Sequence, residues 1–238
     1  MFSTASISSV IESTIDTTIK STIFTPSETV DILSLASLHY DASQGTFTDA
    51  GSTPAGENDD VYQWNSIGTN STNLIQATAG ERPTLKKDGD NWYMDFDGTA
   101  WFDSIAVSPA IPFKDAPNKG GVVVIGRAYE GTGSGTILAN QSLNSVSFTN
   151  NVGCISGLGR PSGDVGRGIG FDGDYIAIIA KTGVANQSYV FLNDFKNTTQ
   201  VTTSSSSLVD FDYINVGTAS LGGVVDVNPL LGRIYDVI

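Results

Sequence analysis

From residue 31 onward, hydrophobic and polar residues alternate along the chain with a period of two. The alternating segments are short and are bounded by Gly, Asn and Asp, which favour tight turns. About a dozen such segments follow one another at intervals of roughly 8–12 residues, the spacing of an all-β sandwich. The run "GGVVVIGRA" is continuously apolar and is therefore expected to form a central strand that is covered on both faces.

The stretch "WYMDFDGTAWFDSI", residues 92–105, places two tryptophans and several carboxylates close together. A sugar-binding cleft has this composition. The same composition is also typical of two successive strands joined by a tight turn, here at Asp97-Gly98. Tyr93, Asp95 and Asp103 are expected on the outer side, keeping the surface in water rather than lining a cleft. Alternation places the other set of side chains inside the sandwich: Trp92, Met94 and Phe96.

Residues 1–30 differ in character and form a predicted N-terminal arm, with the sandwich at 31–238. The arm carries isoleucines at every fourth position in a Ser/Thr-rich background: Ile11, Ile15, Ile19 and Ile23. This spacing keeps them on one face of either a helix or a strand, so both conformations stay open. Because a lone isoleucine stripe cannot bury itself, the arm is expected to dock on a partner or on sister subunits. A disordered or self-packed leader is the alternative, and Pro26 is expected to act as the hinge.

Composition narrows the classes of partner. The chain has 25 acidic and 12 basic residues and a net charge of −13, which argues against binding to nucleic acid or to anionic membranes. No segment reaches the roughly 18 apolar residues of a membrane helix, and the N-terminus lacks the basic and then apolar pattern of an export signal. A neutral or weakly charged ligand is therefore expected.

The chain has one cysteine, Cys154, and one histidine, His39. These counts exclude an internal disulfide, a thiolate zinc cluster and a multi-histidine metal site. A Ser-His-Asp triad would have to use His39, which lies in "LASLHYDAS", a pattern typical of a strand that enters a turn. His39 is expected to be a packed side chain rather than a catalytic one.

Nine motifs follow one another between residues 35 and 238: "SLHYDAS", "VYQWNSIG", "NLIQATAGERPTL", "WYMDFDGTAWFDS", "GGVVVIGRAY", "GTILANQ", "SYVFLNDF", "YINVGTAS" and "LLGRIYDVI". Their order resembles the concanavalin A-like lectin/glucanase superfamily in its laminin G-like branch, of the kind found in phage structural proteins. The resemblance implies a jelly-roll sandwich in which "LLGRIYDVI" is the closing strand. It also implies rim loops that bind glycans or proteins, often beside a calcium ion, and some members of the superfamily are glycosidases.

The glycosidases of this superfamily carry two glutamates with an aspartate between them on one strand face. Retaining hydrolysis needs such a pair because an acid and a nucleophile must lie about 5 Å apart. The glutamates of this chain are isolated from one another, and no Glu-x-Asp-x-x-Glu pattern occurs. The chain is therefore expected not to be an enzyme.

Aspartates at two places could together hold a calcium ion, which takes about six to eight oxygen ligands. The carboxylates are Asp59 and Asp60 in one segment and Asp172 and Asp174 in another. Turn formation is the preferred interpretation, because Asp and Gly readily adopt positive φ. No cofactor is expected, with calcium as the alternative.

Two Gly-rich segments, "GRAYEGTGSG" and "GLGRPSGDVGRGIG", lack the lysine of a phosphate-binding loop and are expected to be loops at a rim of the sandwich. Recognition residues of such folds lie on rim loops. The candidate ligand-binding residues are Tyr129, Arg160, Asp164 and Arg167.

The arm, the missing export signal and the lectin-like domain together predict a non-enzymatic virion structural protein. It would be a fibre, decoration or receptor-binding protein at the virion surface, and its sandwich would bind cell-surface glycans. The expected partners are other virion proteins reached through the arm, sister copies in a homo-oligomer, and host glycans. The alternatives are an extracellular carbohydrate-binding module of a larger enzyme system and a glycosidase of the same fold.

Overall fold

The structure is a computed structural model of the 238-residue chain. It describes residues 32–104, 121–128, 135–140, 144–148, 174–181, 187–192, 199–202, 214–217, 220–221, 224–225 and 230–238. Helix in these ranges is confined to α3 (Ile32–Leu35) and the 3₁₀ turn η2 (Ala79–Glu81). Neither helical segment of the described part is long and apolar enough to cross a membrane. The remaining regular structure is β-strand, as the period-two pattern predicts.

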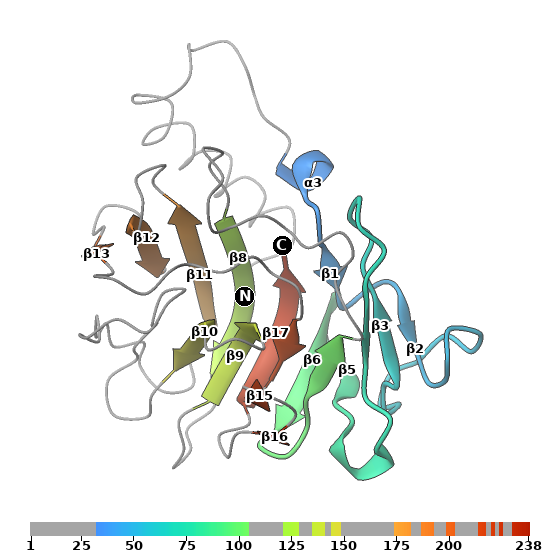
Figure 1. Cartoon of the computed structure of the whole chain (residues 1–238). Coiled ribbons are helices and arrows are strands. Elements are labelled where there is room, and N and C mark those ends of the chain that lie inside the picture. Colours follow the sequence, from blue (N-terminus) through green and yellow to red (C-terminus); the bar gives the residue numbers. More distant parts are fainter. Residues whose placement is uncertain are drawn as a thin grey trace.

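The larger sheet has eight strands (Figure 1). Its order is β13 (Thr199–Thr202), β12 (Gln187–Leu192), β11 (Asp174–Lys181), β8 (Gly121–Ala128), β17 (Leu231–Val237), β6 (Asn91–Asp97) and β5 (Thr84–Asp88), with β1 (Tyr40–Asp41) also paired to β17. Every pairing in this sheet is antiparallel. Residues 121–128 of the run "GGVVVIGRA" form β8 between β11 and β17, so the prediction of a central strand is confirmed.

The smaller sheet has seven strands. Its order is β10 (Asn144–Phe148), β9 (Gly135–Asn140), β14 (Asn215–Val216), β7 (Phe102–Ser104), β4 (Asn73–Ile75), β3 (Gln63–Asn65) and β2 (Thr46–Phe47). A separate hairpin pairs β15 (Ser220–Leu221) with β16 (Val224–Val225).

Aromatic side chains fill the space between the two sheets. Trp64 of the smaller sheet lies 5.7 Å from Tyr40 of the larger sheet and 5.9 Å from Phe102 of its own sheet, measured between ring centroids. Phe96 of the larger sheet meets Phe102 edge to face at 6.3 Å. All four rings are fully buried. The core of the sandwich therefore lies where the inner faces of the sheets meet, and the predicted all-β sandwich is confirmed.

The chain passes from one sheet to the other through the predicted turn at Asp97-Gly98. Gly98 has a φ of 89°, a conformation that favours glycine. The Asp97 carboxylate accepts hydrogen bonds from the backbone N–H of Thr99 at 2.8 Å and of Ala100 at 3.1 Å. The turn thus ends β6 and directs the chain toward β7 in the opposite sheet.

The N-terminal end of the sandwich differs from its predicted form. The segment "VDILSLASLHYDAS", residues 30–43, is predicted to be a strand region, whereas the structure has the short helix α3 followed by a two-residue strand, β1. The segment after α3 pairs with the loop that follows β3: Thr69 N–H donates to the Ala36 carbonyl at 3.0 Å and Asn70 N–H to that of Ser37 at 2.7 Å. These loop contacts satisfy backbone groups that a longer strand would have paired within a sheet.

Candidate functional site

The outer face of the larger sheet carries a connected group of aromatic and charged side chains, which we call the face cluster. Alternation along β6 buries Met94 and Phe96 in the core, so Tyr93 and Asp95 point to the other face. Strands β5 and β17, on either side of β6, contribute outward-facing side chains to the same region. The face cluster consists of Lys86, Asp88, Tyr93, Asp95, Arg233 and Tyr235.

Tyr93 forms the centre of the face cluster. The Arg233 guanidinium carbon lies 4.2 Å from the centroid of the Tyr93 ring, within range of a cation–π contact. The Tyr235 ring meets Tyr93 edge to face at 5.8 Å and an interplanar angle of 61°. These neighbours leave Tyr93 only 5% exposed, although it does not face the core. Tyr235 is half-buried.

Two ion pairs surround this aromatic centre. Lys86 Nζ pairs with Asp95 Oδ2, and the hydrogen bond to Asp95 raises the pKa of Lys86. Arg233 Nη1 donates to Asp88 Oδ2 at 3.3 Å. The Asp95 side chain is 14% exposed and that of Asp88 is 44% exposed. The face cluster therefore presents fixed donors and acceptors beside aromatic rings while part of its surface reaches solvent.

The strand register extends the face cluster into a row of polar residues across the sheet. Arg233 lies opposite Asp95 on one side and opposite Arg127 on the other. Arg127 in turn lies opposite Asp174, and Asp95 lies opposite Thr84. Directly opposed residues share one face of a sheet. Arg233 and Arg127 are thus neighbours at the middle of the row, and Asp95 lies next to Arg233.

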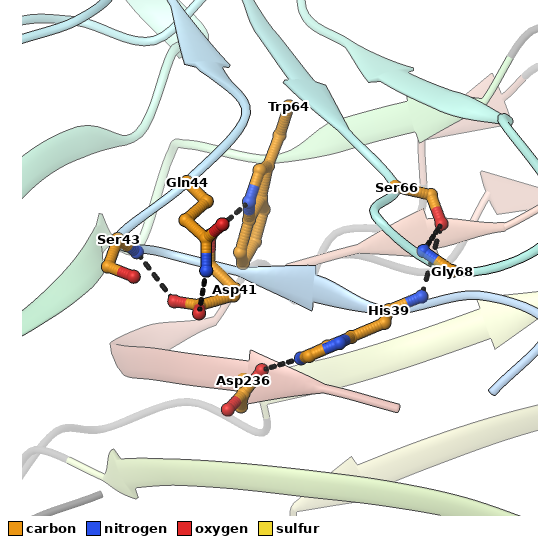
Figure 2. Close-up of polar contacts among 8 residues, drawn as sticks. All are labelled: His39, Asp41, Ser43, Gln44, Trp64, Ser66, Gly68 and Asp236. Carbon is orange, nitrogen blue, oxygen red and sulfur yellow. Dashed lines mark hydrogen bonds and ion pairs between the residues drawn. The ribbon is translucent and has the colours of Figure 1, made fainter. Parts of the chain in front are cut away.

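A second polar centre surrounds the single histidine, next to β1 and the end of β17 (Figure 2). His39 Nε2 lies 2.8 Å from Asp236 Oδ1. The backbone N–H groups of His39 and Gly68 donate to Ser66 Oγ at 3.1 and 3.2 Å. Ser66 Oγ thus contacts the backbone of His39 and not its ring. The His39 residue is 7% exposed, in agreement with the expectation of a packed side chain.

Asp41 lies beside this pair and is held by its own contacts (Figure 2). Its carboxylate accepts from Ser43 N–H at 2.7 Å and from Gln44 Nε2 at 3.0 Å, and its carbonyl accepts from Trp64 Nε1 at 3.0 Å. The hydrogen bond to Asp236, followed by the charges of Asp236 and Asp41, raises the pKa of His39 despite its burial. Burial also raises the pKa of Asp236, although His39 opposes that rise.

Two of the predicted calcium carboxylates, Asp60 and Asp174, lie far apart in the strand register. Asp60 forms an isolated bridge to Thr84. From Thr84, the directly opposed residues on successive strands are Asp95, Arg233, Arg127 and finally Asp174. Strands lie about 4.8 Å apart, so Asp60 and Asp174 are on the order of 24 Å apart along the row. Asp59 Oδ2 accepts from Gly56 N–H at 2.8 Å, as expected of a turn residue. Across the described ranges no three His, Cys, Asp or Glu side chains are grouped as metal ligands.

Several predicted site residues lie outside the described residues. They are Tyr129, Arg160, Asp164 and Arg167 of the rim loops, Asp172 of the calcium set, and Ile11, Ile15, Ile19 and Ile23 of the arm.

The stretch "WYMDFDGTAWFDSI" does not form a cleft of its own. Tyr93 and Asp95 lie on the larger sheet, whereas Asp103 lies on β7 of the smaller sheet, opposite Asn215. Burial raises the pKa of Asp103. Trp92 is only half-buried, at the end of β6, and Lys87 Nζ lies 5.3 Å from its ring centroid. The inner-face prediction is thus correct for Met94 and Phe96, while Trp92 lies toward the edge.

Sequence reasoning missed the contributions of β5 and β17 to the face cluster. In "LLGRIYDVI", Arg233 and Tyr235 alternate with the buried Gly232 and Ile234. This alternation indicates that the side chains of Arg233 and Tyr235 face outward. The sequence pattern could not predict that Arg233 and Tyr235 lie close to Tyr93, because this depends on β17 pairing with β6, which is far away in the chain.

Comparison with known proteins finds similarity only at the level of structure. No protein-family profile and no curated protein matches the sequence. The binding domain of botulinum neurotoxin serotype G is similar with a TM-score of 0.53 and 9% identity, over 85% of this chain and 47% of that one. Trypanosoma rangeli sialidase in complex with 2,3-difluoro-KDN gives a TM-score of 0.50 and 10% identity, over 84% of this chain and 30% of that one. This chain spans less than half the length of either structure, and at such identity the likeness concerns the β-sandwich fold.

Proposed function

We propose that this chain is a non-catalytic carbohydrate-binding β-sandwich and that the face cluster contacts the sugar. The observation that carries the proposal is the contact of the Tyr93 and Tyr235 rings between two ion pairs, Lys86–Asp95 and Arg233–Asp88, on one solvent-reaching sheet face. Sugars present apolar C–H faces and hydroxyl groups side by side. Aromatic rings pack on the former, and carboxylates and guanidinium groups hydrogen-bond the latter.

The rigidity of the face cluster favours recognition. Its side chains project from three neighbouring strands, β5, β6 and β17, and each charged group is oriented by an ion pair or a ring contact. Side chains that are already ordered lose little conformational entropy when a ligand binds. Because cations and carboxylates are interleaved, a neutral hydroxyl-rich ligand fits this surface better than a highly charged one.

The charge arrangement also favours binding over hydrolysis. A glycosidase needs one carboxyl group as a proton donor and a second as a nucleophile or base. In the face cluster Asp95 pairs with Lys86 and Asp88 with Arg233, so both carboxylates already serve as partners of cations.

A glycan array tests the proposal. The full chain is applied to immobilised neutral and acidic glycans with and without calcium, and bound glycans are then incubated with the protein to detect released sugar. The expected result is binding to a restricted group of glycans without release. Absence of binding to every glycan under both conditions, or release of sugar, would refute it.

A matched pair of variants assigns the binding to the face cluster. Asp95→Asn removes the charge that pairs with Lys86, whereas Glu57→Gln makes the same chemical change at an exposed loop position that is not part of the cluster. Losing a hydrogen bond to a charged group costs about 1.5–3 kcal/mol, so Asp95→Asn is expected to weaken binding about tenfold or more. Glu57→Gln is expected to bind like the wild type.

We also infer that residues 1–30 attach the sandwich to a larger assembly such as a virion surface. The isoleucine stripe of Ile11, Ile15, Ile19 and Ile23 supports this inference, since an apolar face in a Ser/Thr-rich segment needs a partner. Deleting residues 1–30 should leave the sandwich folded by circular dichroism and abolish oligomers in sedimentation velocity. Unchanged assembly of the shortened chain would contradict the attachment role.

A further inference from the structure

Strand β17 contains a bulge at Tyr235. Its pairing with β8 is regular through Ile234, which lies opposite Gly126, and resumes with Asp236 opposite Ile125. Tyr235 is the extra residue between them. A bulge of this kind turns side chains relative to the regular alternation. Ile234 and Val237 both remain in the core although they are three positions apart.

The bulge lies where β17 changes its neighbour. On the side away from β8, β17 pairs with β6 through Ile234 and with β1 from Asp236 onward. The Tyr235 carbonyl accepts a hydrogen bond from Ala42 N–H at 3.0 Å. The position of Tyr235 therefore depends on how firmly the β1 segment stays attached.

The attachment of β1 brings two carboxylates together. Asp41 and Asp236 are directly opposite in the β1–β17 register, and like charges in such a position are destabilising. His39 provides the compensating cation, since its Nε2 lies 2.8 Å from Asp236 and both carboxylates raise its pKa. The loop after β3 faces His39 with the uncharged hydroxyl of Ser66. Among the described residues, Asp236 and Asp41 are the charged groups that act on His39.

We propose that the charge of His39 sets the position of Tyr235 and thereby controls ligand binding at the face cluster. With His39 protonated, its positive charge offsets the repulsion between Asp41 and Asp236, β1 stays attached, and Tyr235 packs against Tyr93. With His39 neutral, the two carboxylates repel each other and the bulge loosens. His39 acts as a positioning residue, because it touches Asp236 and not the ligand surface. The effect on ligands rests on the proposed function, whereas the coupling between His39 and Tyr235 does not.

The coupling can be measured in the ligand-free protein. His39 is the only histidine among 238 residues, so every imidazole signal in an NMR spectrum belongs to it. The chain is labelled with ¹³C at histidine and tyrosine rings and titrated from acid to alkaline pH, and Tyr235→Phe identifies the Tyr235 signal. The expected result is a shift of the Tyr235 ring signal with the same midpoint as that of His39.

Two variants separate this mechanism from a general effect of pH. In His39→Gln, the amide can donate to Asp236 but does not titrate, so the Tyr235 shift should disappear. In Asp41→Asn, the amide oxygen can still accept from Ser43 while the repulsion is removed, so the shift should become smaller. A Tyr235 signal that stays constant in the wild type, or that moves equally in His39→Gln, would overturn the proposal.

The effect on ligand binding is measured with a glycan selected on the array. Wild-type affinity is expected to fall about fivefold or more between the two His39 charge states, a usual size of coupling between sites, and to be independent of pH in His39→Gln. If no glycan binds, the proposed function fails, and the ring titrations still decide whether His39 controls Tyr235. Affinity that is constant with pH while both rings titrate together would overturn the control of binding.

Discussion

Gly217 provides a test of how the two sheets pack, because it allows a close approach across the core. It follows β14 of the smaller sheet and has a φ of 86°. A Cβ atom at this position would lie 2.5 Å from two ring carbons of Phe96 in the larger sheet and 3.2 Å from the Ala100 carbonyl oxygen. Phe96 is fully buried and cannot turn away without disturbing Phe102. Gly217→Ala should therefore destabilise the protein in two ways.

The two contributions have different sizes and origins. An alanine in a left-handed conformation costs about 1–2 kcal/mol. Overpacking a dense core costs about 1–3 kcal/mol more. The expected loss for Gly217→Ala is thus about 2–5 kcal/mol, or a decrease in Tm of roughly 2–4 °C for each kcal/mol in a chain of this size.

Gly89 provides the matched control. It has a φ of 63° at the turn between β5 and β6, and a Cβ atom there would meet nothing within 4 Å. Gly89→Ala should therefore show the backbone cost alone, about 1–2 kcal/mol. Both variants are unfolded in urea and followed by tryptophan fluorescence and circular dichroism. Equal losses in the two variants would refute the inferred packing of Gly217 against Phe96.

Three further predictions concern other parts of the sandwich. Because the pKa of His39 is raised above 6.5, the stability that its protonated form contributes is complete below pH 6.5 and is lost as pH rises through the raised pKa. The raised pKa of Asp236 likewise makes the protein less stable as pH rises. Urea unfolding at a series of pH values should show this alkaline loss in the wild type and not in His39→Gln, and an identical slope in both proteins would contradict it. Asp97→Ala removes the hydrogen bonds that order the turn between the sheets and should lower the free energy of unfolding by about 1–2 kcal/mol. Burial raises the pKa of Asp97, but the hydrogen bonds from Thr99 and Ala100 lower it overall. The difference in stability between the wild type and the variant should therefore shrink below pH 3.8. Trp64→Leu removes a fully buried ring and its hydrogen bond to the Asp41 carbonyl, and it should lower the free energy of unfolding by about 3 kcal/mol or more. A loss below about 1 kcal/mol, which is about a fivefold change in the folding equilibrium, would be inconsistent with a central core position.

The sandwich could be predicted because its signals are local. Alternation in "NWYMDFD", the Asp97-Gly98 turn and the apolar β8 segment each depend on a few neighbouring residues. The same local rules do not report strand order. They could not show that Tyr93 and Asp103, ten positions apart, would lie on opposite sheets, or that Arg233 would stack on Tyr93.

The site residues that sequence reasoning missed depend on long-range pairing and on an irregularity. His39 meets Asp236 across 197 positions, and the bulge at Tyr235 interrupts the alternation of β17 beyond that residue, where Asp236 lies. Trp92 illustrates a different limit. By alternation Trp92 belongs to the core face, but it lies near the end of β6, is only half-buried, and has Lys87 Nζ over its ring.

The most direct test of the account follows the tyrosine rings while a glycan binds. A glycan selected on the array is titrated into the ¹³C-tyrosine-labelled chain at a pH at which His39 is protonated, with Asp95→Asn and Glu57→Gln measured in parallel. We expect saturable shifts of the Tyr93 and Tyr235 signals in the wild type and in Glu57→Gln, and much weaker binding by Asp95→Asn. Saturable glycan binding that leaves both ring signals unmoved would contradict it.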